Sequence, residues 1–429
     1  MAPGDPVAPC SAADAARRLR ERGVTRTLAI VGGGLAGMSV AHHAAAADAN
    51  VGIAVFDVAE PGEGGASAAA AGLLHPLTTR GGLIWHGVES FQSAAQLVAQ
   101  TQARSGAQFC FARGVLRVAR SEAQATTYRA AAERAIRQHA LTVSDGDVEG
   151  GELLCWVDAA RARELIGADA APADCAGGVW CARGLCVDAP AYLRALWAAT
   201  CEAAACALWV VHPVHSLDAA CAHFDAVVVA VGAASASVRG LEALPVSLVR
   251  GQTLCWPDVP LPLCPRVGVL GGQYLVPLGG DSGRVPAADG RAATGGAARV
   301  VGGATFEPLS AGAAPLGSAD ASTVALAELC EELAQLWPMS AQVAEGSGPP
   351  RPHGMGVRAM PPRTRLGSVP LAGRVPGHER NAWFVAGLGG RGLLYHAELG
   401  RTVALAALAD DDGALLPDCT WPHRAAASY

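Results

Sequence analysis

The sequence predicts an α/β protein in which a mostly parallel sheet is interrupted by a mainly antiparallel β domain. Short apolar runs at 28–31, 224–233 and 382–393 place strands of one sheet near the start, middle and end of the chain. The middle run is rich in β-branched residues without alternation, which is typical of a strand buried on both faces of a parallel sheet. The segment 114–119 instead alternates polar and apolar residues, as a half-buried strand does.

A glycine-rich turn follows the first apolar run and predicts a dinucleotide site. The pattern G-x-G-x-x-G is followed by a predicted helix and a second apolar run that ends on Asp57. Its glycines permit a tight turn, close approach of the backbone to a pyrophosphate, and close packing of helix on strand. The helix N-terminus favours an anion, and the acid is placed to bind a ribose. The residues assigned to this site are Gly32, Gly34, Leu35, Ala36, Gly37 and Asp57.

The rest of the sequence predicts further strands, helices and one long loop. Further strands are predicted at 245–254, 273–277 and 299–307, and helices at about 122–140, 321–336 and 394–408. The segment 279–298 is rich in Gly, Ala, Asp and Arg and is interpreted as an extended hairpin loop.

These elements predict two domains, the first of them discontinuous. At 429 residues the chain exceeds the usual size of a single core. We expect a flexible N-terminal segment at 1–25 and a polar, loose tail at 409–429. The nucleotide domain is assigned to 26–105, 180–244 and 346–408, and the substrate domain to 106–179 and 245–345.

Composition excludes several classes of chemistry. The sequence contains no lysine, so all 32 basic residues are arginine, which excludes Schiff-base catalysis and a Walker-type ATP site. The net charge of −6, without a long basic cluster, makes nucleic acid an unlikely partner. Thirteen cysteines occur without a C-x-x-C pair, so we expect no metal site and read them as buried apolar residues in a reducing compartment.

No segment reaches the roughly twenty uninterrupted apolar residues that a membrane span needs. We therefore expect a soluble protein of the cytoplasm or an organelle, and not a secreted one. The Arg- and Ala-rich residues 1–25 leave two interpretations open, the remnant of an organelle-targeting peptide or a frayed helix.

Several further motifs, in order, resemble the D-amino-acid-oxidase-like family of FAD-dependent oxidoreductases over about residues 27–408. Within the family, the motifs resemble those of the glycine and sarcosine oxidases and of the oxidase half of the bifunctional enzyme that modifies the tRNA wobble uridine. The motifs are Gly-Ala-Ser…Ala-Gly-Leu at 65–74, Val-Asp-Ala-Pro at 187–190, Arg-Gly-Gln at 250–252 and Gly-Ala-Thr-x-Glu at 303–307. The resemblance implies a discontinuous Rossmann-like FAD-binding domain with an inserted, mainly antiparallel β substrate domain.

The resemblance also implies the flavin contacts. Histidine or cysteine attaches the flavin covalently in some members, but the histidine position is Ala69 here and no cysteine lies close to Arg358 in the sequence. Non-covalent FAD is therefore expected, and NAD(P) is disfavoured because the later motifs match flavin contacts. Beyond the glycine turn, the expected contacts are Ser67, Ala71, Gly72, Leu73, Gly232, Gly389, Gly390, Arg391, Gly392 and Leu393.

On the substrate side the resemblance implies roles for Arg358 and Tyr274. Arg358 would grip a carboxylate with two parallel hydrogen bonds, and Tyr274 would face the same group. A structural salt bridge and an ordinary strand tyrosine are the alternatives. The family's aspartate after this arginine is missing, and Arg363 and Arg365 stand nearby instead, either at the site or exposed on the surface. His75 is interpreted as a polar contact near the flavin or a loop residue, with a catalytic role as the alternative.

The resulting hypothesis is oxidation of the C–N bond of an amino acid or a carboxylate-bearing secondary amine. A hydride passes to FAD, the imine hydrolyses, and dioxygen is the expected acceptor with release of peroxide. Two alternatives remain open: an oxidase acting on a carboxymethylamino group of tRNA, although no part of the chain is left for a methyltransferase, and a non-catalytic flavin-binding assembly protein. The substrate's identity and the oligomeric state are not predicted.

Overall fold

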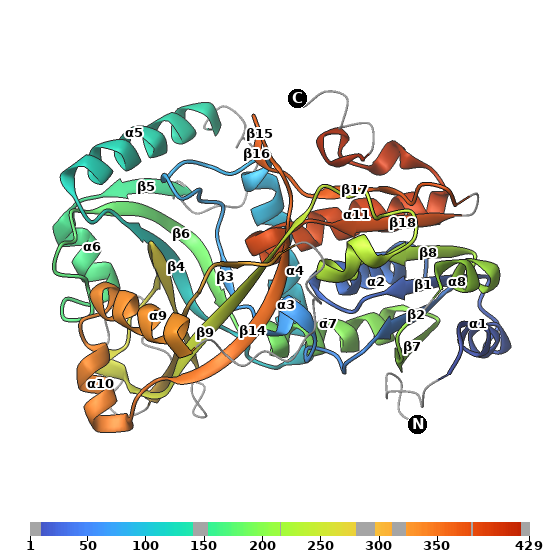
Figure 1. The fold of residues 1–429 in the computed structure, drawn as a ribbon, viewed down its shortest axis with the longest axis horizontal. Coiled ribbons are helices and arrows are strands. Elements are labelled where there is room, and N and C mark those ends of the chain that lie inside the picture. Colours follow the sequence, from blue (N-terminus) through green and yellow to red (C-terminus); the bar gives the residue numbers. More distant parts are fainter. Residues whose placement is uncertain are drawn as a thin grey trace.

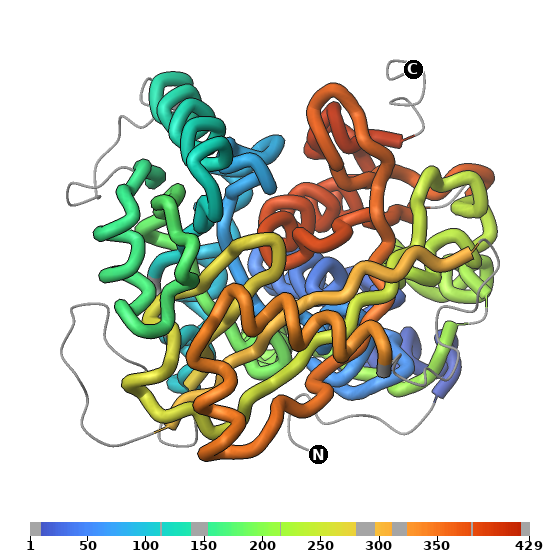
Figure 2. The backbone as a smooth tube through the Cα atoms, turned by 60° about the vertical axis from the view of Figure 1, so that its left-hand side comes forward, coloured from blue at the N-terminus to red at the C-terminus, as the bar shows by residue number. Residues whose placement is uncertain are grey.

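The computed structural model describes residues 10–139, 153–214, 216–279, 297–310, 323–378 and 381–421. The described chain forms two halves side by side, each built around one sheet (Figure 1). Segments from the start and the end of the chain lie together in the first half, while the middle of the chain forms most of the second (Figures 1 and 2). The predicted loop at 279–298 lies almost wholly outside the described residues.

The first sheet is parallel except for one antiparallel edge strand. The three apolar runs of the sequence contribute strands to this one sheet, as predicted, and the three strands are neighbours. Its strands, in spatial order, are β17 (Leu371–Arg374), β18 (Ala382–Ala386), β8 (Ala226–Val229), β1 (Arg26–Val31), β2 (Val51–Asp57) and β7 (Cys206–Val211).

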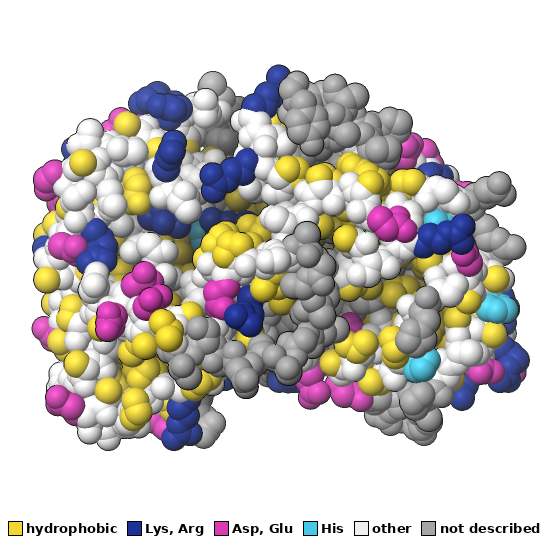
Figure 3. Space-filling model, viewed as in Figure 1, with side chains coloured by type: hydrophobic (Ala, Val, Ile, Leu, Met, Phe, Trp, Pro, Cys, Tyr) yellow, Lys and Arg dark blue, Asp and Glu magenta, His cyan; other side chains and the backbone are white. Residues whose placement is uncertain are grey.

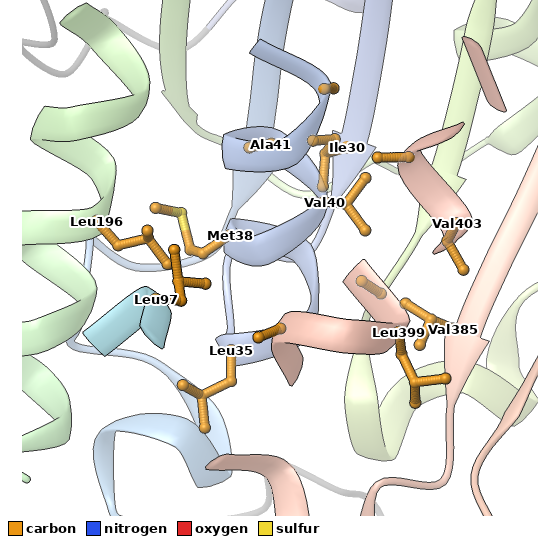
Figure 4. Close-up of a cluster of buried hydrophobic side chains, with 14 of the residues drawn as sticks. Ile30, Leu35, Met38, Val40, Ala41, Leu97, Leu196, Val385, Leu399 and Val403 are labelled. Atoms are coloured by element: carbon orange, nitrogen blue, oxygen red, sulfur yellow. The ribbon is translucent and has the colours of Figure 1, made fainter. Parts of the chain in front are cut away.

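Helices cover both faces of the first sheet, which is why its strands are apolar without alternation. Leu28 and Ile30 of β1 point into one core, and Ala29 and Val31 into the other. Figure 4 shows Ile30 in the first core with residues of four helices. Those helices are α2 (Leu35–Ala47), α4 (Gly87–Ser105), α7 (Ala189–Ala203) and α11 (Gly392–Ala409), and the second core is covered by α1 (Ala12–Glu21) and α8 (Leu217–His223).

The N-terminal segment differs from the flexible or frayed stretch that we expected. Within 1–25, residues 12–21 form α1, whose N-terminus is capped by the side chain of Ser11. Ala15, Ala16 and Leu19 are at most 1% exposed, since they pack against the first sheet. Ala15 and Ala16 precede Leu19 by four and three residues, and this helical spacing gives α1 one buried face that holds the helix in place.

The second sheet is mainly antiparallel, as predicted, with one parallel pair between β4 and β10. Its strands, in spatial order, are β13 (Glu307–Pro308), β9 (Ser247–Pro260), β12 (Ala297–Gly303), β11 (Gln273–Gly279), β10 (Gly268–Gly271), β4 (Cys110–Val118), β6 (Gly178–Val187) and β3 (Leu73–Leu74), with β14 (Arg351–Met360) beside β9 and β5 (Leu154–Val157) beside β6.

One face of this sheet is closed by helices and the other faces the first half. The closed face packs its apolar side chains against α6 (Ala159–Ile166), α9 (Thr323–Leu336) and α10 (Ser340–Ser347). The opposite face is partly covered by α5 (Glu122–His139) and by the segment that precedes β3. We call this opposite face the inner face.

The predicted domain boundaries at 180 and 346 do not coincide with the edges of the sheets. Most of β6 and all of β14 fall inside the ranges assigned to the nucleotide domain, yet both strands belong to the second sheet. Their apolar residues gave no sign of the sheet they join, because strand pairing is settled by partners far away in the sequence.

The C-terminal tail is packed rather than loose as far as residue 421. Two short 3₁₀ turns, η4 (Asp412–Ala414) and η5 (Pro417–Cys419), lead to Trp421, whose N–H donates to Ala372 O at 3.0 Å. Cys419 is fully buried in the first core, and Trp421 stacks edge-on against Phe384. Leu415 and Leu416 also pack on the first core, so the apolar residues of the tail dock it on the first half.

No helix among the described residues is long and apolar enough to cross a membrane. On the face shown in Figure 3, acidic and basic side chains are interspersed with apolar ones. Several cysteines are buried, and burial raises the pKa of the Cys181 thiol to about 12. Among the described residues, no three side chains of the metal-ligating types lie close enough together to hold a metal ion.

Candidate active site

The glycine turn between β1 and α2 allows backbone contacts that a side chain would block. Gly32 has φ of +103°, and a Cβ there would lie 2.5 Å from Ala230 O. A Cβ on Gly37 would lie 1.9 Å from Gly32 O, so only glycine lets α2 pack this closely on the turn. Gly34 ends the turn and precedes the first residue of α2 without a side-chain cap. The N–H groups of Ala36 and Gly37 in the first helical turn have no partner within the helix.

Two side chains hold this turn in place. Asp57, at the end of β2, accepts hydrogen bonds from Gly33 N at 2.5 Å and from Ala59 N at 3.1 Å. The Ser67 hydroxyl accepts one from Leu35 N at 3.0 Å. The structure therefore gives both residues a role within the turn itself, and the ribose contact of Asp57 stays a prediction.

The segment 65–74 joins the two halves. Its helix α3 (Gly65–Ala68) lies against β14, where a Cβ on Gly356 would come within 2.6 Å of Ala66 Cα. Gly72 has φ of +91°, and its carbonyl accepts from Val187 N at 2.8 Å. Ala71 and Leu73 then pack on the inner face of the second sheet. The expected flavin contacts in this segment thus lie between the two sheets.

The segment before α11 approaches the same place from the C-terminal end of the chain. The 3₁₀ turn η3 (Gly389–Arg391) runs directly into α11, beginning at Gly392 and Leu393. A Cβ on Gly392 would lie 3.3 Å from Leu35 Cδ1, so the N-termini of α11 and α2 are neighbours. A Cβ on Gly390 would lie 3.8 Å from Arg358 Nη1. The predicted cofactor residues of α2, α3 and η3 are therefore brought together.

Gly232 follows β8 at the same edge of the first sheet. It begins the 3₁₀ turn η1 (Gly232–Ser237) with φ of +56°, and a Cβ there would meet open space. Here glycine is required by the backbone conformation rather than by crowding.

The inner face of the second sheet carries the polar side chains. Strand register places Arg117, Leu270, Tyr274, Gly303 and Thr253 in one row across β4, β10, β11, β12 and β9. Residues paired across strands point to the same face, so this row faces the first half. We call it the inner row.

Arg358 of β14 lies at one end of this face. Its Nη2 donates to Thr305 O at 3.1 Å, and its Nε is buried without a partner. A Cβ on Gly251 would lie 2.6 Å from Nη2, so glycine in the neighbouring strand leaves the guanidinium its space. No carboxylate of the described residues pairs with Arg358, which argues against the structural salt bridge.

Tyr274 lies close enough to Arg358 for the charge of the arginine to act on its hydroxyl. Burial raises the pKa of the Tyr274 hydroxyl to about 12, and the charge of Arg358 partly opposes that shift. A Cβ on Gly303 would lie 2.6 Å from the Tyr274 hydroxyl oxygen, so a second glycine leaves room for the ring. Tyr274 therefore keeps its proton at neutral pH and can donate a hydrogen bond to an anion.

A half-buried network of hydrogen bonds fixes the carbonyl that holds Arg358. Glu307 accepts from Arg250 Nη2 at 2.6 Å, from Gln252 Nε2 at 2.7 Å and from the Thr305 hydroxyl at 2.6 Å. Burial opposes the charge of Glu307, but these hydrogen bonds outweigh burial and lower its pKa. The Arg-Gly-Gln and Gly-Ala-Thr-x-Glu motifs thus act together to position Thr305.

His75 and Arg391 lie side by side near Arg117, the first residue of the inner row. His75 is 3% exposed, and its Nε2 lies 3.0 Å from Arg391 Nη1. Arg391 Nη2 also donates to Leu77 O at 2.9 Å. Burial, and then the charges of Arg391 and Arg117, lower the pKa of His75 well below its usual value, so the ring is neutral. His75 thus makes polar contacts with Arg391 and Leu77, and its contact with the flavin stays a prediction.

Sequence reasoning missed Arg117. This side chain is 6% exposed and lies near Arg391 and His75. The local sequence carried no clear signal, because Leu116 and Val118 fill the other face of β4 and the same alternation fits a strand with Arg117 exposed. Arg363 and Arg365 are exposed, on and beside the small hairpin of β15 (Arg363–Thr364) and β16 (Gly367–Ser368), and lie outside the site.

These features define a dinucleotide-binding protein in which a parallel sheet supplies the phosphate turn and a second sheet supplies ionic side chains. Residues 27–406 match the family model described as FAD-dependent oxidoreductase. The chain therefore belongs to this family, the D-amino-acid-oxidase-like FAD-dependent oxidoreductases. No curated protein sequence matches it.

Solved structures give the same fold. Glycine oxidase from Geobacillus kaustophilus is 21% identical, with a TM-score of 0.65 over 91% of this chain and 97% of the oxidase. Iminodiacetate oxidase from Chelativorans sp. BNC1 is 19% identical, with a TM-score of 0.63 over 92% and 99%. L-proline dehydrogenase from P. horikoshii is 14% identical, with a TM-score of 0.66 over 90% and 94%.

The residues of this chain fit the FAD of its family. The turn at Gly32–Gly37 leaves its backbone bare where a Cβ would intrude, and the first turn of α2 keeps N–H groups for a pyrophosphate. The N-terminus of α11 lies beside it and offers further N–H groups and a positive dipole end to an electron-rich ring edge.

Proposed function

We propose that the protein oxidises the C–N bond of an amino acid or another carboxylate-bearing amine. The observation that carries this proposal is Arg358, a half-buried guanidinium with no acidic partner among the described residues and with Tyr274 beside it. The named activities of the similar structures, glycine oxidase and iminodiacetate oxidase, agree with it. The chemistry that FAD supplies when bound is the acceptance of two electrons as a hydride.

The chain's own residues would bind and orient the substrate. Arg358 offers two N–H groups to one carboxylate, and the neutral Tyr274 hydroxyl adds a third donor. Holding the carboxylate at this point fixes the adjacent C–H relative to α2, α3 and η3, where the cofactor residues converge. The amine would be oxidised to an imine, which water hydrolyses to a carbonyl compound and a free amine or ammonia.

The visible spectrum of the purified holoprotein tests the proposal. Candidate substrates such as glycine, sarcosine, alanine and proline are added without oxygen, and a true substrate bleaches the flavin band. Readmitting air should restore the band with one peroxide per substrate if dioxygen is the acceptor. Retention of yellow flavin with no bleaching by any amine would instead favour a non-catalytic flavoprotein.

Arg358→Met provides the matched comparison. This variant should keep its flavin, because Arg358 contacts neither the glycine turn nor Asp57. A much higher concentration of the same amine should be needed to bleach its flavin. A carboxymethylamino group carried by tRNA is the other outcome, and a gel shift with tRNA would reveal it.

A further inference from the structure

Two guanidinium groups and a neutral imidazole meet at the far end of the inner row without a balancing acid. Arg117 is 6% exposed, its Nε is buried without a partner, and its other contact is the Tyr128 hydroxyl. Arg391 Nη1 lies 3.0 Å from His75 Nε2, and Arg391 Nη2 donates to the Leu77 carbonyl. Among the residues that the structure describes, no Asp or Glu forms an ion pair with either arginine. Buried charges are ordinarily paired, so this cluster is suited to bind an anionic group.

The hydrogen bonds of His75 point to the same conclusion. Its Nδ1 accepts from Leu77 N at 3.1 Å, and a backbone N–H can only donate. The single proton of the neutral ring is therefore assigned to Nε2, which faces Arg391 Nη1 at 3.0 Å. Two N–H donors thus point toward each other. An anionic oxygen beside them would accept from both and remove the conflict.

This cluster is separate from Arg358 but belongs to the same site. Arg117 and Tyr274 are both in the inner row, with Leu270 of β10 between them, so their backbones lie about two strand spacings, roughly 10 Å, apart. The turn η3 spans that distance on the other side, because Gly390 lies beside Arg358 and Arg391 reaches His75. An extended molecule that reached from Tyr274 and Arg358 to Arg117 would meet a cationic group at each end.

We propose that Arg117, Arg391 and His75 form a second anion subsite, which binds the distal carboxylate of a dianionic amine while Arg358 and Tyr274 bind the proximal one. The inference rests on the proposed function and narrows its substrate class to short amines that carry two carboxylates. The two anion-binding clusters, one at Arg117 and one at Arg358, then select substrate length as well as charge.

Equilibrium binding of unreactive carboxylates to the holoprotein tests the subsite without turnover. The probes are propionate, butyrate and valerate against malonate, succinate and glutarate, which match them in chain length but carry a second carboxylate. Each is titrated at one fixed, low ionic strength and followed by the perturbation of the flavin spectrum. At least one dicarboxylate should bind tenfold or more tightly than its monocarboxylate partner.

Single substitutions show which arginine causes the preference for dicarboxylates. Arg117→Met should bring the ratio of the two affinities close to one, whereas Arg117→Lys, which keeps the charge, should retain part of the preference. Arg183→Met removes an exposed arginine from the neighbouring strand β6 and should leave the ratio unchanged. Arg358→Met should weaken both classes of probe. Thermal unfolding of each variant shows that the fold is kept.

The outcomes separate the inference from the proposed function. If monocarboxylates bind through Arg358 but dicarboxylates bind no better, or if the preference survives Arg117→Met, the subsite is overturned and amine oxidation stands. If Arg117→Met lowers the flavin midpoint potential without changing the affinity ratio, the cluster serves the cofactor and the inference is wrong. If no carboxylate binds and no amine bleaches the flavin, both proposals fail.

Discussion

The first sheet offers a ligand its backbone, whereas the second offers side chains. Around the parallel sheet, Gly32, Gly34 and Gly37 clear the space, and the groups left to bind are peptide N–H donors at the start of α2. On the antiparallel sheet the inner row presents Arg117 and Tyr274 beside Arg358. One part of the site thus binds through main-chain N–H groups, and the other part binds through side chains.

This difference has a consequence for substitution. A backbone site fails when any Cβ intrudes, because main-chain atoms cannot move aside as a flexible side chain can. A side-chain site fails by losing charge or orientation while the fold remains. Changes in the first half should therefore affect cofactor retention, and changes in the second should affect substrate affinity. The following predictions test that division, from the largest expected effect to the smallest.

Gly37→Val should abolish retention of FAD. Its Cβ would lie 1.9 Å from Gly32 O, which forces α2 away from the turn and misplaces the N–H groups. A loss of about 3 kcal/mol in binding corresponds to a roughly hundredfold weaker affinity. Absorbance after gel filtration measures it, with Gly346→Ala in α10 as control, because a Cβ at Gly346 meets nothing. Normal flavin content in Gly37→Val would contradict the backbone assignment.

Arg358→Met should raise KM for a carboxylate-bearing amine by about two to three orders of magnitude. Two hydrogen bonds to a charged group, each worth roughly 2 kcal/mol, are lost. Steady-state kinetics at fixed flavin content measures the change. An unaltered KM would remove Arg358 from substrate binding, and a loss of flavin would erase the division between the halves.

Glu307→Gln should raise KM roughly tenfold while kcat changes less. The side chain touches Arg250, Gln252 and Thr305 but not Arg358, so its effect passes through the Thr305 carbonyl. Loss of its charge weakens a network of hydrogen bonds each worth about 1 kcal/mol or somewhat more. Recovery of KM in Glu307→Asp would support this positioning role. Equal losses in KM and thermal stability for both variants would indicate a structural role alone.

Acid should destabilise the first half through its buried histidines. Burial lowers the pKa of His42 and His43 to about 4 and that of His396 to about 3. The unfolded chain binds protons at these rings below about pH 6.5, whereas the folded chain does not until pH 4 or below. Stability is therefore complete above pH 6.5 and falls with decreasing pH, by up to about 1.4 kcal/mol per pH unit for each histidine.

His396→Gln isolates one of these groups. In the native protein His396 Nδ1 donates to Leu393 O at 2.9 Å, and Nε2 accepts from the Tyr192 hydroxyl at 2.7 Å. Between pH 6.5 and 4, the unfolding free energy of the variant should depend less steeply on pH. The slope should fall by about 1.4 kcal/mol per pH unit, the contribution of one titrating group. Chemical denaturation at several pH values measures the slope. An unchanged slope would show that His396 does not titrate as its burial requires.

The two halves also differed in how far the sequence could predict them. The glycine turn, Asp57 and the three strands around them were recognisable because steric exclusion of every side chain but hydrogen leaves a mark at fixed spacing. Arg358 and Tyr274 were found only through resemblance to a family. Arg117 was missed because its partner strands, β10 and β6, are separated from it by long stretches of chain.

The sequence by itself determined the dinucleotide turn, the parallel sheet around it and the mainly antiparallel character of the inserted strands. These follow from local sterics and from short-range hydrophobic pattern. Only the tertiary structure decided which sheet β6 and β14 join, that α1 and the tail are docked, and that Arg117 lies in register with Tyr274. Register is set by pairing between distant segments, so no local pattern encodes which charges meet across a sheet.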